Sequence, residues 1–149
     1  MLYCTTTFCH ITVYRVKRFT SFTMTSAKKS EIGRIGEDIA CKYLRNKGFI
    51  VLGRNVRQKW GEIDIVAKNI DGVIAFVEVK TLREGGDLKP EDNLTKSKLA
   101  KLKRTAMLYA GHHHDLINDQ KGWRIDLVAI TLEGEHGDTK ISYYENICY

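Results

Sequence analysis

The chain has 149 residues, of which 43% are hydrophobic and 28% are charged, with a net charge of +6. These values are typical of one globular domain with its own core, and they exclude a membrane-spanning helix, because no apolar run approaches the roughly 20 residues that cross a bilayer. The four cysteines, at positions 4, 9, 41 and 148, lack the spacing of a zinc site or a disulfide framework. Their pattern favours a reducing cytoplasm, and the lack of a long apolar run predicts that no membrane is a partner.

The first 23 residues differ from the rest of the chain. They carry no acidic residue, show no helical period and lack the continuous apolar segment of a signal peptide. Met24 then opens a segment that is typical of the start of a bacterial protein. We expect residues 1–23 to be a disordered or mis-annotated extension before a true start at Met24, and residues 24–149 to form a single domain.

The first predicted helix covers residues 30–47. Ser30 is its expected N-cap, and Gly48 is expected to end it in the left-handed conformation. Its apolar residues recur at helical spacing and form one stripe. Glu37 lies at the edge of this stripe, where a carboxylate can lean into a cleft while its helix stays packed.

Further elements follow from periodicity and turn residues. They are five strands and a second helix, over residues 49–56, 63–68, 73–80, 123–131, 141–147 and 95–110. Residues 54–60 are expected to be a polar connection, and residues 81–93 an exposed loop. Asp71-Gly72 is a strong turn signal, so the second and third strands should form an antiparallel hairpin. The expected order is α-β-β-β-α-β-β.

Two of these strands carry acidic side chains where a strand is normally apolar. Asp64 and Glu78 lie on neighbouring strands of the hairpin, and Lys80 shares a face with Glu78 because residues i and i+2 project to the same side. Burying such charges is costly unless they are compensated. The alternative is a surface strand with scattered ion pairs.

A divalent metal ion and a phosphate group would compensate these charges. Magnesium takes oxygen ligands, usually one or two carboxylates together with water and substrate phosphate. Asp64 and Glu78 are therefore the predicted metal ligands, and Glu37 could add a third oxygen. Lys80 would position or help to deprotonate the attacking water, or balance charge in the transition state.

The motif Glu78-Val79-Lys80, with Asp64 upstream, resembles the D…(D/E)xK pattern of the restriction-endonuclease-like, or PD-(D/E)XK, nuclease superfamily. The helical Glu37 before them is similar to the arrangement in archaeal Holliday-junction resolvases. Over about residues 30–149 the chain more closely resembles the YraN family of bacterial proteins. The segments that carry this resemblance include Gly33-Arg34-Ile35-Gly36-Glu37, Gly61-Glu62-Ile63-Asp64, Phe76-Val77-Glu78-Val79-Lys80 and Arg124-Ile125-Asp126.

The resemblance implies an α/β fold with a restriction-endonuclease-like core, in which helices flank a mixed central β-sheet. It places Asp64 and Glu78 on Mg²⁺ or Mn²⁺, Lys80 as the catalytic lysine and Glu37 as the accessory acid. The proline that often precedes the aspartate in the superfamily is replaced by Ile63, which costs little because the metal needs only the carboxylate.

The second predicted helix is basic. Lys98, Lys101 and Arg104 lie on it with no acidic residue between them, and they are the candidate nucleic-acid-binding residues; a solvated helix face is the alternative. Glu62 is either a second metal ligand or the partner of a nearby arginine. Trp60 either stacks on bases or packs at the rim of the core.

These observations predict a metal-dependent DNA endonuclease of the cytoplasm, with branched or damaged DNA among its candidate substrates. The rival hypothesis is a nucleic-acid-binding or assembly module on the same fold, without cleavage of its own. Paired incision of a four-way junction would require two active sites and therefore a homodimer. The three residues His112, His113 and His114 are expected to lie in a loop, and Asp126 to form an internal ion pair with Arg124.

Overall fold

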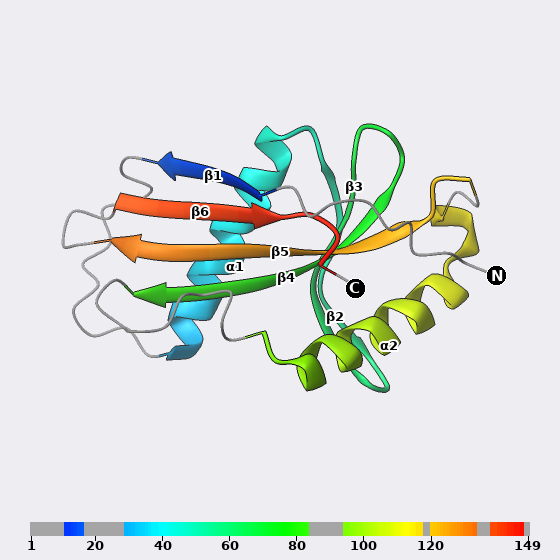
Figure 1. Cartoon of the computed structure of the whole chain (residues 1–149). Helices are drawn as coiled ribbons and strands as arrows, with labels where there is room; N and C mark the ends of the chain where they lie inside the picture. Colours follow the sequence, from blue (N-terminus) through cyan, green and yellow to red (C-terminus); the bar gives the residue numbers. More distant parts are fainter. Residues whose placement is uncertain (1–10, 17–28, 84–93, 118–119, 134–137, 148–149) are drawn as a thin grey trace.

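The computed structural model describes residues 11–16, 29–83, 94–117, 120–133 and 138–147. In chain order, its elements are β1 (Ile11–Val16), α1 (Lys29–Asn46), β2 (Ile50–Gln58), β3 (Gly61–Lys68), β4 (Ile74–Arg83), α2 (Lys96–His112), the short 3-10 helix η2 (His114–Leu116), β5 (Trp123–Glu133) and β6 (Asp138–Tyr144) (Figure 1). No helix within these ranges is both long enough and apolar enough to span a membrane.

The described strands form one six-stranded sheet in the order β1-β6-β5-β4-β3-β2. The central pair, β4 and β5, is parallel, and every other pair is antiparallel. A parallel pair needs a long crossover, and α2 lies in the connection between β4 and β5. The predicted mixed α/β sheet flanked by helices is therefore confirmed.

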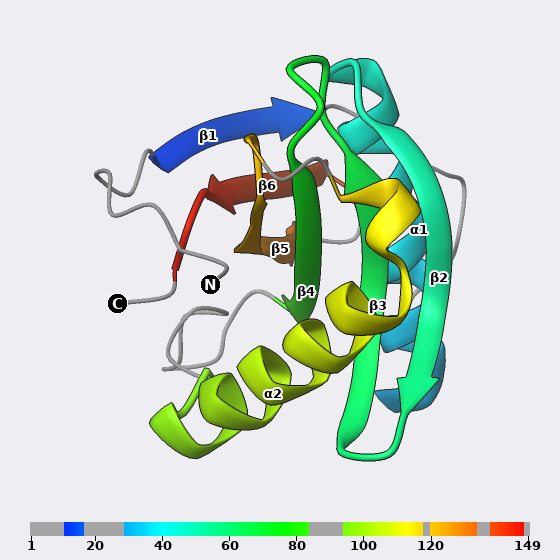
Figure 2. The same ribbon diagram turned by 90° about the vertical axis from the view of Figure 1, so that its right-hand side faces the viewer.

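The two helices pack on opposite faces of the sheet. One apolar cluster joins α1, through residues such as Ile39 and Leu44, to Ile65 and Val77 of the sheet. The other joins α2, through residues such as Leu102, to Phe76 on the opposite face of β4. Figure 2 shows this arrangement, with α2 in front of β3 and β4 and α1 behind β2 and β3.

The N-terminal part of the chain departs from the expectation of a disordered arm at one place. Residues 11–16 form β1, which pairs antiparallel with β6 at the edge of the sheet. The ring of Tyr14 lies against Tyr43 of α1, and the ammonium group of Lys47 lies 4.0 Å from the centroid of the Tyr14 ring. The remaining residues of the 1–23 segment lie outside the described ranges, and the start at Met24 stays a prediction.

The boundaries of α1 and β2 also differ from those expected. Ser30 is not the N-cap, because α1 already includes Lys29, whereas Gly48 has the predicted positive φ of 84° just after the helix. The expected polar connection over residues 54–60 was wrong, because β2 continues to Gln58 and pairs with β3 through its charged residues. Only Lys59 and Trp60 form the turn between them.

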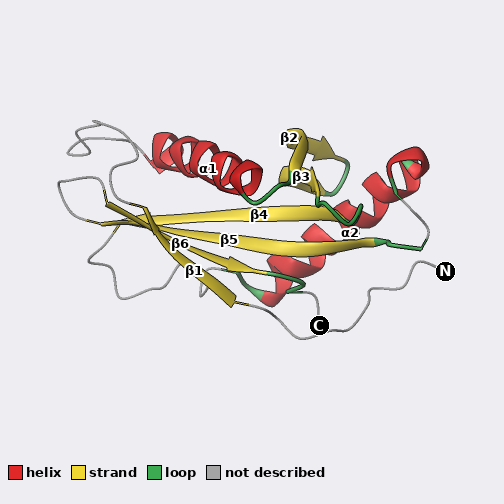
Figure 3. Ribbon diagram, turned by 90° about the horizontal axis from the view of Figure 1, so that it is seen from above, coloured by secondary structure: helices red, strands yellow, loops and turns green. Residues whose placement is uncertain are grey.

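The hairpin of β3 and β4 forms as predicted. The amide of Val73 donates to the side chain of Asn69 at 2.8 Å, and Gly72 has a φ of 90°, which a glycine adopts without strain. The two strands pair only from Ile65–Val77 to Lys68–Ile74. Beyond these pairs β3 turns away from β4. Figure 3 shows the β2–β3 hairpin almost end-on, whereas β4 and β5 run across the picture.

The expected ion pair of Asp126 is confirmed and belongs to a buried network. Asp126 is fully buried, and its carboxylate accepts from Arg124 Nε at 3.0 Å, from the Tyr143 hydroxyl at 2.5 Å and from the amide of Asn146 at 2.8 Å. Burial raises the pKa of Asp126, and these donors act against that rise. A buried carboxylate with this many donors is a structural group that ties the end of the chain to β5.

Helix α1 approaches β4 very closely at Gly36. A Cβ atom at this position would lie 1.8 Å from Thr81 Oγ1 and 2.9 Å from Thr81 Cβ, so rotation of the hydroxyl alone would not relieve the clash. We expect Gly36→Ala to lower the free energy of unfolding by about 1–3 kcal/mol, because the helix must move away from the strand. Urea denaturation followed by circular dichroism measures this change.

Gly33, one turn earlier in α1, provides the matched control for this prediction. A Cβ atom there would meet nothing within 4 Å. Gly33→Ala should therefore stabilise the protein by about 0.5–1 kcal/mol through helix propensity. Equal effects of the two substitutions would contradict the close contact between α1 and β4.

Candidate functional site

The candidate site lies where β3 separates from β4. After the pair of Ile65 and Val77, β4 no longer pairs with β3 within the described residues, but it continues to pair with β5 as far as Arg83. At this point the carboxylate of Asp64 accepts a hydrogen bond from the backbone amide of Val79 at 2.7 Å. A side chain of β3 thus takes the place of a backbone acceptor, and this hydrogen bond fixes the position of Asp64 beside β4.

Glu78 is the buried centre of the site. Only 3% of the residue is exposed, and its Oε1 atom forms ion pairs with Lys80 Nζ and with Lys98 Nζ, the latter at 2.8 Å. Lys80 comes from the same strand and Lys98 from the first turn of α2. A buried carboxylate is stable only when it is paired, and here two ammonium groups pair with it.

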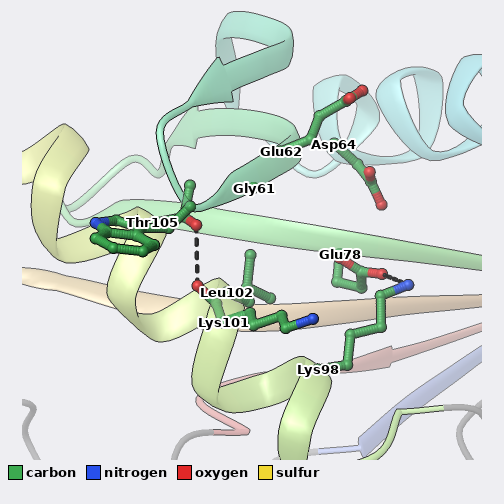
Figure 4. A pocket seen from close by; sticks show the side chains of 9 residues that line it. Gly61, Glu62, Asp64, Glu78, Lys98, Lys101, Leu102 and Thr105 are labelled. Carbon is green, nitrogen blue, oxygen red and sulfur yellow. Dashed lines mark hydrogen bonds and ion pairs between the residues drawn. The ribbon is translucent and has the colours of Figure 1, made fainter.

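Asp64 and Glu78 line one cavity of about 310 Å³. Its wall is formed by the start of β3, by β4 and by one face of α2, through the residues Trp60, Gly61, Glu62, Asp64, Glu78, Lys98, Lys101, Leu102 and Thr105. Figure 4 shows the carboxylates of Asp64 and Glu78 beside the same space, with Lys98 of α2 reaching Glu78 and Lys101 on the same helix. The cavity therefore combines two acidic groups with a basic helix face.

The environment shifts the pKa values of two groups at this site. Burial and the nearby charge of Glu78 raise the pKa of Asp64 to about 7. Burial also lowers the pKa of Lys80, and the positive charge of Lys98 adds to this effect while Glu78 opposes it. The pairing with Glu78 raises the pKa of the more exposed Lys98. Of the two lysines, Lys80 is thus the one that loses its proton more easily.

The donor set fits a divalent metal ion with two protein ligands. Two carboxylates that face one space repel each other, and this repulsion adds to the effect of burial in raising the pKa of Asp64. A hard cation would compensate the charge of both. Within the described residues no group of three His, Cys, Asp or Glu side chains is placed to hold a metal. One or two carboxylates are nevertheless the usual protein contribution to a magnesium site.

Glu37 lies near these residues but has its own partners. Its Oε2 atom accepts from Asn55 Nδ2 at 2.9 Å and lies 3.6 Å from Arg54 NH2. Asn55 has a φ of 50°, a conformation that asparagine tolerates better than most residues. Glu37 is still close enough for its charge to raise the pKa of Asp64. Its predicted role as an accessory acid and third metal ligand stays a prediction.

The basic residues of α2 divide between two places. Lys98 and Lys101 line the cavity, whereas the guanidinium of Arg104 lies 5.1 Å from the centroid of the Trp60 ring. The ion pair of Lys98 with Glu78 was not predicted, because Lys98 was assigned to nucleic-acid binding alone. The spacing of Lys98 and Lys101, one helical turn apart, was the only sequence feature that placed both on one face.

The structure also places Glu62 and the histidine run. Glu62 lines the cavity and pairs with Arg57 at 3.3 Å, so the predicted salt bridge with an arginine of β2 is present. The histidine run is not a loop throughout, because His112 ends α2 and His114 opens η2, and His113 lies between these two helices.

The fold and the site together define an α/β protein with a mixed sheet and a carboxylate–lysine cluster at the fork of two strands. The uncharacterised protein family UPF0102 matches residues 36–130, and the chain belongs to this family. This result confirms the resemblance to the YraN family.

Individual relatives cover most of the chain. A UPF0102 protein of Lawsonia intracellularis is 39% identical over 127 residues, which span 79% of this chain and 90% of the relative. A relative from Syntrophomonas wolfei is 43% identical over 116 residues, or 78% of this chain and 96% of the relative. One from Tropheryma whipplei is 44% identical over 105 residues, or 70% of this chain and 84% of the relative.

Proposed function

We propose that the protein is a metal-dependent endonuclease that hydrolyses phosphodiester bonds in DNA, on a restriction-endonuclease-like core. One observation carries this proposal: Asp64, Glu78 and the lysines that pair with Glu78 converge at the fork of β3 and β4, beside a basic helix. A purely structural ion pair would not require a second carboxylate with a raised pKa in the same cavity.

The residues of the chain divide the chemistry among them. Asp64 and Glu78 would hold Mg²⁺ or Mn²⁺, which supplies Lewis acidity and an acidified water when bound. Lys80, with its lowered pKa, is placed beside Glu78 to accept a proton from water or to donate a hydrogen bond to the phosphate. Lys98 and Lys101 line the same cavity from α2, where they would bind the negative phosphate backbone.

The second candidate is a nucleic-acid-binding or assembly module without cleavage. The same basic helix favours it, since phosphate contacts alone do not require Asp64 and Glu78. We favour the enzyme because burying the carboxylate of Glu78 is costly, and contacts to phosphate alone would not need Asp64 beside it. A homodimer that acts in the cytoplasm remains part of the enzyme proposal.

A panel of labelled DNA substrates tests the proposed function. Linear duplex, nicked, flapped, four-way-junction and single-stranded DNA are incubated with the protein and Mg²⁺ or Mn²⁺, beside Glu78→Ala and a sample with EDTA. The expected result is cleavage of at least one substrate by the wild-type protein alone. If no substrate is cut with either metal, the binding module replaces the enzyme as the proposed function.

Lys98 should compete with the metal for Glu78. Its ammonium group lies 2.8 Å from the carboxylate oxygen that would bind the cation. We expect Lys98→Met to tighten Mn²⁺ binding about five-fold, equivalent to an ion pair worth about 1 kcal/mol. Isothermal titration calorimetry without DNA measures the change.

Lys101→Met is the control for this experiment. Lys101 lines the same cavity one turn further along α2, and its substitution removes an equal charge. Mn²⁺ affinity should change less than two-fold in this variant, while both variants bind DNA more weakly. Weaker Mn²⁺ binding by Lys98→Met would contradict the competition.

A further inference from the structure

Trp60 occupies an exposed position next to the candidate site. It lies in the two-residue turn between β2 and β3, and 45% of it is exposed, whereas only 8% of Trp123 is exposed. Packing at the rim of the core, the alternative for Trp60, leaves this part of the residue exposed.

Two cations lie over the Trp60 ring. The guanidinium carbon of Arg104 is 5.1 Å from the ring centroid, and Lys59 Nζ is 5.0 Å from it. Aromatic rings flanked by basic side chains are the recurring elements of single-stranded nucleic-acid sites, in which bases stack on the ring and phosphates contact the cations. Trp60, Arg104 and Lys59 therefore form a group with the chemistry to bind one nucleotide.

The turn that carries Trp60 is fixed against α2. Gly61 follows Trp60, and a Cβ atom at Gly61 would lie 3.2 Å from Thr105 Oγ1. Thr105 is itself held by a hydrogen bond from its hydroxyl to the carbonyl of Lys101 at 2.9 Å. The backbone of the turn is thus packed closely against the helix beside Trp60.

Trp60 and the carboxylates line the same cavity. Asp64 and Glu78 form one part of its wall, and Trp60 another. Its volume of about 310 Å³ is at the small end of the range for ligand sites, which is room for a single nucleotide. A phosphate near the carboxylates would therefore place a neighbouring base at Trp60.

We propose that Trp60 stacks on an unpaired nucleobase next to the scissile phosphate, so that the substrate is DNA that is single-stranded or unpaired at the cut. This inference rests on the proposed function. A base within a duplex has both faces covered by its neighbours, and it reaches the Trp60 ring only after unstacking. Single strands, flaps and junction branch points offer such bases at low cost, whereas blunt duplex does not.

Binding without metal tests the inference separately from cleavage. Fluorescence anisotropy with EDTA measures the affinity of the full-length protein for a labelled single-stranded thymidine oligonucleotide, for the same oligonucleotide with abasic sites, and for a blunt duplex. Trp60→Ala should weaken binding to the single strand about ten-fold and to the blunt duplex less than two-fold. Trp60→Phe, which keeps an aromatic face, should restore most of the affinity.

Ile70→Ala is the matched control, because Ile70 is an 88% exposed apolar residue in the β3–β4 turn. It should leave all affinities unchanged, and the abasic oligonucleotide should bind wild-type protein and Trp60→Ala equally. Equal loss on single strand and blunt duplex, or no loss on either, would overturn the inference. A selective loss of affinity for single strands supports stacking of Trp60 on an unpaired base, whether or not the protein cleaves DNA. Absence of cleavage would contradict the proposed nuclease activity and not the stacking.

Discussion

Glu78→Gln is expected to reduce metal-dependent cleavage of DNA by at least about a thousandfold while changing DNA affinity only a few-fold. The substitution keeps the shape of a side chain that is 3% exposed, but it removes the charge that would hold the cation and that now pairs with two lysines. Loss of a group that stabilises charge in the transition state commonly costs a hundredfold to a thousandfold in rate, and loss of a metal ligand adds to this. Single-turnover cleavage with Mg²⁺ and anisotropy with EDTA measure the two quantities.

Lys80→Ala should give a similar loss of cleavage with DNA binding retained. The matched control is Glu62→Gln, because Glu62 lines the same cavity and has the same charge, but it pairs with Arg57 on the neighbouring strand. Its cleavage rate should remain within about three-fold of wild type. Cleavage by Glu78→Gln at the wild-type rate would exclude Glu78 from the catalytic site.

Asp64→Asn is expected to abolish cleavage and, at the same time, to stabilise the metal-free protein at pH 8. Burial and Glu78 raise the pKa of Asp64 to about 7, whereas the carboxylate titrates near its ordinary value in the unfolded chain. As the pH rises, the unfolded chain therefore releases this proton before the folded protein does. The free energy of unfolding falls over this pH range. The asparagine carbonyl can still accept from the amide of Val79, so the substitution removes the charge without removing the hydrogen bond.

The sign of the pH dependence follows from this shift. The stability difference between Asp64→Asn and wild type should be near zero below about pH 4, grow between pH 4 and pH 7, and level off at about 1–3 kcal/mol above pH 7. Urea denaturation in EDTA at pH 4, 6 and 8 measures it. Added Mg²⁺ should stabilise wild type but not Asp64→Asn. Equal stability of the two proteins at pH 8 would show that the carboxylate is not destabilised by its surroundings.

Local sequence features predicted the part of the fold that depends on local interactions. The turn at Asp71-Gly72 and the alternation of the flanking strands were enough to predict the β3–β4 hairpin, and hence that Asp64 and Glu78 lie close together. The family resemblance supplied the mixed sheet. The extension of β2 to Gln58 was missed because its charged residues look like a connection, although an edge strand tolerates them on its exposed side.

The contacts that were missed join segments far apart in the chain. Lys98 reaches Glu78 because the first turn of α2 lies beside the middle of β4, and nothing within either segment predicts that contact. Glu37 of α1 accepts from the side-chain amide of Asn55, a residue of β2 with a positive φ. A strand pattern does not predict that backbone conformation. Periodicity places a residue on a face, but only tertiary packing decides which residue of another element it meets.

The hydrogen bond from the Val79 amide to Asp64 connects the site to the backbone of a central strand. A charged acceptor shortens and polarises such a bond, whereas a protonated carboxyl or a carboxylate that shares its charge with a cation accepts more weakly. The ¹H and ¹⁵N resonances of this one amide should therefore follow the state of Asp64. A nuclear magnetic resonance titration with acid or with Mg²⁺ can thus examine the site in solution before any substrate is known.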